Sequence, residues 1–154
     1  MSPELTLMLH VTFGIFAVIA SVWVFVDTLN ARPDNQSRIR CASIAVAVFL
    51  WLTYLVGGYW YVVHYGPDKA LIKAGPWPFA HGFFMETKEH VFLMLLLLGT
   101  YLPIAAFNDL AASKGARVVT LWVSALVVVT GLAMEGAGAF ISMGVKVALL
   151  ASHA

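Results

Sequence analysis

Four long apolar runs, separated by shorter polar stretches, dominate the pattern of hydrophobic and polar positions along the chain. We place these runs at residues 5–28, 41–64, 83–107 and 118–140. Each run is long enough to cross a bilayer core of about 30 Å as a helix that rises about 1.5 Å per residue. The pattern therefore predicts an all-α fold, a four-helix transmembrane bundle that forms a single domain over residues 1–154.

The connections between the runs carry residues that end helices. Residues 30–40 are polar and include three arginines, and residues 108–117 form a second polar turn. Gly66 and Pro67 are expected to end the second helix, and residues 68–84, with Pro76 and Pro78, predict an irregular interfacial segment with one short helical turn at residues 70–74.

The last apolar run continues to Leu150, which is further than one membrane crossing requires. Gly136, Gly138 and Gly144 are positions at which a helix can bend or stop. We therefore expect the fourth crossing to end near Phe140 and to leave a short outer segment.

Composition confirms the class of protein and excludes several functions. The 154 residues are 61% hydrophobic and only 11% charged, with a mean hydropathy of +0.87, values typical of an integral membrane protein. A formal net charge of +1 provides no basic surface for nucleic acid. The single cysteine, Cys41, rules out an internal disulfide, a thiolate zinc cluster and covalent c-type haem attachment.

The polar residues divide between the two faces of a bundle with four crossings. Such a bundle places both termini on one side, and all four arginines (Arg32, Arg38, Arg40 and Arg117) fall in the two loops on the opposite side. Because cytoplasmic loops are enriched in Lys and Arg, we expect that side to be cytoplasmic and both termini to be outside. The expected location is the inner (plasma) membrane of a bacterial cell.

The ionisable residues of the outer half form the candidate site. His10, His64, His90 and Glu135 occupy similar depths on the four predicted helices, and Glu86 precedes His90 by one helical turn. Ionisable groups inside a membrane are costly unless they are paired or bind something, so they indicate function. All five histidines fall in this half: His10, His64, His81, His90 and His153.

Inward imidazoles on facing helices are typical ligands of b-type haem in a helix bundle. We therefore interpret His10, His64 and His90 as candidate haem ligands, with His64 and His90 as the favoured axial pair because they flank one connection. Glu135 is expected to tune the haem potential. On this hypothesis the protein transfers electrons in the membrane, as an oxidoreductase or as a subunit of one.

The layout resembles that of small four-helix membrane cytochromes b, whose spans also carry inward histidines. The resemblance implies a b-type haem and a role in electron transport. Those families place histidines at both membrane depths, whereas this chain has them at one level, which favours a single haem.

Two other classes of function are compatible with the same residues. His10, His64, Glu86, His90 and Glu135 are a mixed nitrogen and oxygen set for non-haem copper, iron or zinc. Alternatively, the chain is a non-enzymatic accessory subunit of a larger membrane complex. The expected partners are the lipid bilayer, a quinol or an outer-face redox protein, and other membrane subunits or further copies of the chain.

Overall fold

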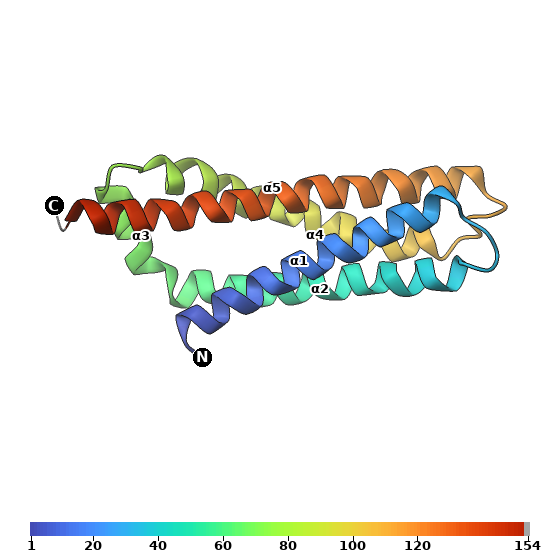
Figure 1. The fold of residues 1–154 in the computed structure, drawn as a ribbon, viewed down its shortest axis with the longest axis horizontal. Helices are drawn as coiled ribbons and strands as arrows, with labels where there is room; N and C mark the ends of the chain where they lie inside the picture. Colours follow the sequence, from blue (N-terminus) through green and yellow to red (C-terminus); the bar gives the residue numbers. More distant parts are fainter. Residues whose placement is uncertain (153–154) are drawn as a thin grey trace.

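The computed structural model of the protein describes residues 1–152, which form helices and turns and contain no strand (Figure 1). Four helical segments are long and apolar enough to cross a membrane, as the hydropathy pattern predicts. The elements are α1 (Pro3–Leu29), α2 (Gln36–Val63), α3 (Tyr65–Ala74), the π-helical segment η1 (Ala80–Met85), α4 (Glu86–Ala106) and α5 (Lys114–Ser152).

The four long helices form a closed ring in which α1 packs on α2 and α5, and α4 packs on the same two helices. Long helices that follow one another in the chain are therefore neighbours and run antiparallel. Helix α5 also packs against α1, and this contact closes the ring. The chain begins and the described part ends at one end of the bundle, where α3 also lies (Figure 1). We call this the terminal end, and the opposite end, at residues 30–35 and 107–113, the turn end.

Small and hydroxyl-bearing residues bring α1 close to α5. Gly14, Ala17 and Ser21 are buried along one face of α1. The Ser21 hydroxyl donates a hydrogen bond of 3.0 Å to the backbone oxygen of Ser124 in α5. Small residues of this kind allow helix backbones to approach closely in membranes, where apolar contact alone does not favour helix association.

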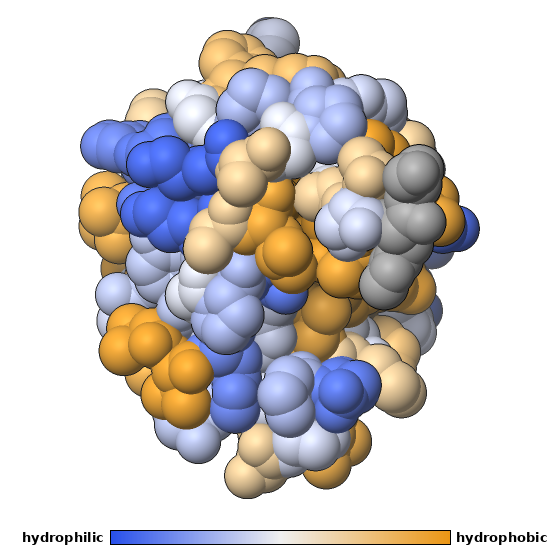
Figure 2. Space-filling view, turned by 90° about the vertical axis from the view of Figure 1, so that its left-hand side faces the viewer, coloured by the Kyte–Doolittle hydropathy of each residue, from blue (hydrophilic) through white to orange (hydrophobic). Residues whose placement is uncertain are grey.

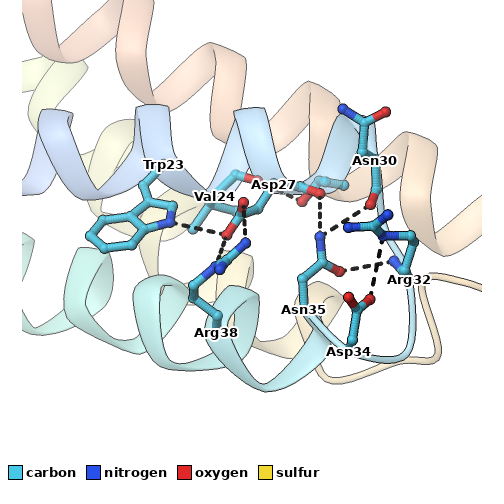
Figure 3. Close-up of polar contacts among 9 residues, drawn as sticks. Trp23, Val24, Asp27, Asn30, Arg32, Asp34, Asn35 and Arg38 are labelled. Atoms are coloured by element: carbon cyan, nitrogen blue, oxygen red, sulfur yellow. Dashed lines mark hydrogen bonds and ion pairs between the residues drawn. The ribbon is translucent and has the colours of Figure 1, made fainter.

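A hydrogen-bonded network fixes the α1–α2 connection at the turn end (Figure 3). Arg38 donates two hydrogen bonds to the Asp27 carboxylate, at 2.6 and 2.9 Å, and Trp23 donates a third at 3.0 Å. Asn35 accepts from the Arg32 backbone nitrogen at 2.8 Å and donates to the Asp27 backbone oxygen at 3.2 Å. Arg32 pairs with Asp34, and Arg38 pairs with Asp27, so residues of the same connection hold two of the arginines at this end.

The connection from α2 to α4 is more ordered than the sequence predicts. Helix α3 covers ten residues rather than a single turn at 70–74. Pro67 is its third residue, a position at which the missing backbone N–H costs no helical hydrogen bond. Tyr65 and Ile72 are fully buried against η1 and α5, so tertiary packing stabilises this short helix. Figure 2 looks on to the terminal end, where patches of hydrophilic side chains lie between apolar ones.

Helix α5 also differs from the prediction, since it continues for 39 residues without ending near Phe140. At about 1.5 Å per residue it is roughly 58 Å long, which exceeds a bilayer core of about 30 Å. Gly144 does not stop the helix but allows close packing, because a Cβ there would lie 2.6 Å from the Cβ of Ala80. The C-terminal part of α5 thereby supports α3 and η1.

This close contact gives a prediction about stability. Gly144→Ala is expected to lower the free energy of unfolding by about 1–3 kcal/mol, because the rigid Cβ of Ala80 has no space to move away. Gly136→Ala is the matched control on the same helix, since nothing lies within 4 Å of a Cβ there. Thermal unfolding in detergent compares the two variants. Equal or higher stability of Gly144→Ala relative to Gly136→Ala would contradict the packing described here.

Candidate functional site

The imidazole of His10 is held in one orientation by Thr53 of α2. Its Nδ1 lies 2.9 Å from the Thr53 backbone oxygen and 2.8 Å from the Thr53 hydroxyl oxygen. The same hydroxyl donates its only hydrogen to the His10 backbone oxygen, at 2.8 Å. Both Thr53 oxygens therefore accept from Nδ1–H, and this tautomer leaves Nε2 of His10 with a free lone pair.

Gly57 provides the space that this orientation requires. It follows Thr53 by one helical turn and so lies on the same face of α2. A Cβ at Gly57 would collide with Nδ1 and the adjacent ring carbon of His10, whereas a Cβ at the neighbouring Gly58 would meet nothing within 4 Å. Thr53 and Gly57 together form the seat of the imidazole.

A pocket of about 330 Å³ adjoins this imidazole in the half of the bundle near the terminal end. Its volume falls in the range of small-molecule and cofactor sites, about 300–1,000 Å³. The lining is mostly apolar, with few polar groups, and comes from all four long helices and η1. The lining includes His10, Thr53, Gly57, Gly58, Trp60, Tyr61, Lys88, Glu89, Phe92 and Gly138.

A second, smaller cavity of about 20 Å³ lies deeper, and His10 and Lys88 line both spaces. Glu135 of α5 lines only the small one. Gly14 of α1 makes room for this carboxylate, because a Cβ there would collide with Oε1 of Glu135. A polar cavity needs about 10–15 Å³ to hold one water molecule, so a water fits between these three ionisable groups.

Of the four residues predicted to share one site, the structure brings only His10 and Glu135 to the same cavity, together with Lys88, which the sequence did not single out. Lys88 belongs to α4 and lies on the same face as Phe92 and Leu95, which also line the small cavity. Within the polar run that ends at His90, Lys88 is the residue on the inward side of α4. Lys88 is half-buried among helices that are long and apolar enough to cross a membrane, where an ionisable side chain is costly, so we include it in the candidate site.

His90 does not share this site. It is exposed on the surface of α4, and its Nδ1 donates a 2.7 Å hydrogen bond to the Glu86 backbone oxygen one turn earlier. Because successive helical residues are about 100° apart, His90 lies about 200° around the helix from the inward Lys88. His90 lines neither cavity.

Glu86 is occupied elsewhere, by a histidine of η1. Oε1 of Glu86 lies 3.4 Å from Nε2 of His81, and the other ring nitrogen of His81 lies 3.1 Å from the Tyr65 hydroxyl. Burial, followed by nearby phenolic and carboxylate groups, raises the pKa of the Tyr65 hydroxyl, which therefore stays protonated and donates to Nδ1. His81 thus contacts Tyr65 of α3 through one ring nitrogen and lies beside Glu86 of α4 through the other, and it connects η1 to both helices.

His64 ends α2 and lies against the ring of Tyr59, away from both cavities. Its Nε2 is buried and has no hydrogen-bond partner. His153 lies outside the described residues. Over residues 1–152, no three His, Cys, Asp or Glu side chains gather closely enough to hold a metal ion. Of the five candidate metal ligands, the structure brings only His10 and Glu135 to one cavity.

No known protein family matches the chain, and searches of curated proteins and of solved structures found no match. The candidate site is therefore defined by its own geometry. Its parts are an oriented imidazole with a free Nε2, an inward lysine, a carboxylate across a small cavity, and an adjoining pocket of cofactor size.

Proposed function

We propose that the protein is an integral membrane b-type haem protein of electron transfer, with one haem in the large pocket and His10 as an axial ligand. The observation that carries this proposal is the tautomer of His10. Histidines that ligate metals almost always donate their other ring N–H to a carbonyl or carboxylate, as His10 does to Thr53. When bound, the haem iron would carry one electron between its ferric and ferrous forms.

The lining of the pocket suits a flat, largely apolar ring. Gly57 and Gly58 expose the α2 backbone on one side, and Trp60, Tyr61 and Phe92 contribute aromatic side chains. Apolar surroundings of this kind control access of water to a cofactor and so influence its redox potential. The role of the protein is to bind the ring, to hold the imidazole and to exclude water.

The favoured axial pair of the sequence hypothesis, His64 and His90, fits this pocket less well than His10. Neither residue lines it, and His90 faces away from the inward side of α4. Within residues 1–152, His10 is the only histidine of the pocket. His10 is therefore the residue that would hold the haem iron in this pocket.

The test is the absorption spectrum of the protein purified from haem-replete cells, together with its metal content. A Soret band with iron near one atom per chain supports the haem proposal. Stoichiometric copper, iron or zinc without a Soret band would instead select a non-haem metal site. The absence of both would favour the accessory-subunit interpretation and would reject a haem function.

The orientation of the bundle is a further part of the proposal. We place the terminal end outside, because all four arginines contact residues at or near the turn end. In a protein whose exposed Cys41 is replaced by Ser, a cysteine at Ser2 should react in intact cells with a membrane-impermeant maleimide. A cysteine at Asp34 should react only after the cells are permeabilised. Labelling of Asp34→Cys but not Ser2→Cys in intact cells would reverse the orientation.

A further inference from the structure

We propose that Lys88 is the anion-binding residue of the large pocket and pairs with a carboxylate of the ligand, which for haem is a propionate. This inference rests on the proposed function and deepens it, because it names the group that recognises the acidic part of the ligand. It assigns two separate contacts to the site, the iron to His10 and a carboxylate to Lys88.

The first argument is the incomplete pairing of Lys88. Within the described chain, no carboxylate oxygen lies within 4.0 Å of its Nζ, since the ion pairs found there involve Asp27, Asp34 and Glu86 instead. An ammonium group has three hydrogens to donate and no capacity to accept. Burying such a group without a partner is costly, so an anionic partner that enters the pocket would be bound favourably.

Glu135 is close enough to attract Lys88 electrostatically but does not reach it. Its carboxylate lies across the small cavity, in the space left by Gly14. The hydrogens of Nζ therefore remain free for another acceptor. Lys88 and Glu135 therefore do not form a salt bridge with each other. Lys88 can bind an anionic group of a ligand while the Glu135 carboxylate lies nearby.

The lysine also does not extend to the water at the terminal end. Long lysine side chains near helix ends often do so and then have no further role. Here Nζ lies 3.1 Å from the position that a Cβ at Gly138 would occupy, which places the amine between α4 and α5. Lys88 shares the large pocket with His10, so a single ligand can contact both residues.

The experiment compares haem with haem dimethyl ester, which lacks the two ionised carboxylates but keeps the iron and the ring. Both are titrated into the full-length protein in detergent, and affinity is read from the Soret band. The wild-type protein should bind haem about 10–100-fold more tightly than the ester, the range expected for a charge-assisted hydrogen bond in a buried site. Lys88→Met should bind the two forms about equally.

Three variants make the comparison specific. Lys88→Arg keeps the charge and should retain the preference for the acid, and Lys88→Gln replaces Lys88→Met if the latter does not fold. Lys146→Met removes an exposed lysine of α5 and should behave as wild type. Because ligand and residue are changed in turn, the loss of the preference measures their coupling and not a general weakening of the site.

The outcomes separate this inference from the proposed function. Equal binding of acid and ester by the wild type, or an unchanged preference in Lys88→Met, overturns the role of Lys88 and leaves haem binding intact. Binding of neither form by the wild type overturns both proposals. Loss of the preference in Lys146→Met as well would overturn the assignment to Lys88, because surface charge would then explain it.

Discussion

His10→Ala is expected to lose most of its haem when it is purified from haem-replete cells. The change removes the imidazole that lines the large pocket and leaves Thr53 without the N–H donor of His10. Loss of a group that only orients a metal ligand typically costs 10–100-fold in affinity, so loss of the ligand itself should cost at least this much. The measurement is the haem-to-protein ratio.

His90→Ala is the matched control for this variant. His90 also donates Nδ1–H to a backbone oxygen, that of Glu86, but it lies on the exposed side of α4. Its replacement should leave the haem content and the Soret maximum unchanged. A wild-type haem content in His10→Ala, with loss of haem in His90→Ala, would return the axial role to the surface histidine and reject the site described here.

Gly57→Ala is expected to reduce haem affinity strongly, by about 10–100-fold. A methyl group at this position would collide with the His10 ring, and the ring would have to turn away from both Thr53 oxygens. The imidazole would then lose the tautomer and the direction that suit it for ligation. Haem titration followed at the Soret band measures the effect.

Gly58→Ala provides a control that differs by one position on the same helix. Nothing lies within 4 Å of a Cβ at Gly58, although this residue also lines the large pocket. We expect a clearly smaller loss of affinity than in Gly57→Ala, because a methyl group at Gly58 leaves the His10 ring in place, and a slightly more stable helix, since Ala favours the helix by about 1 kcal/mol over Gly. If both variants bind haem with the same affinity, the space that Gly57 leaves for the His10 ring does not determine haem binding.

The four long helices could be predicted from the sequence because each apolar run is long and uninterrupted. The parts that differ depend on packing between distant residues. Glycines of the last run indicated a bend or a stop. Instead α5 stays helical, and Gly144 leaves space in which Ala80 packs against it. Pro67 indicated the end of a helix, but it lies in the first turn of the next helix, α3, where proline is tolerated.

The positions of the candidate residues along their helices could be predicted from the sequence, whereas the direction of their side chains could not. The run that follows His90 is apolar on every side of the helix, so no amphipathic pattern shows which face of α4 is inward. Lys88 and His90 therefore look equivalent in the sequence, although the structure places only the lysine in the cavities. The use of Thr53 and Gly57 by His10 follows from the α1–α2 register, which the sequence does not reveal.

The most direct measurement of the central claim is chemical rescue of His10→Ala by imidazole. The substitution leaves a cavity in which a free imidazole fits beside Thr53, and cavities of this kind bind ligands of matching shape. We predict that millimolar imidazole restores haem binding and the wild-type spectrum in His10→Ala. Gly57→Ala, in which the ring of His10 is displaced but present, should not respond in the same way. A wild-type spectrum in His10→Ala without imidazole would contradict the assignment of His10 as the axial ligand.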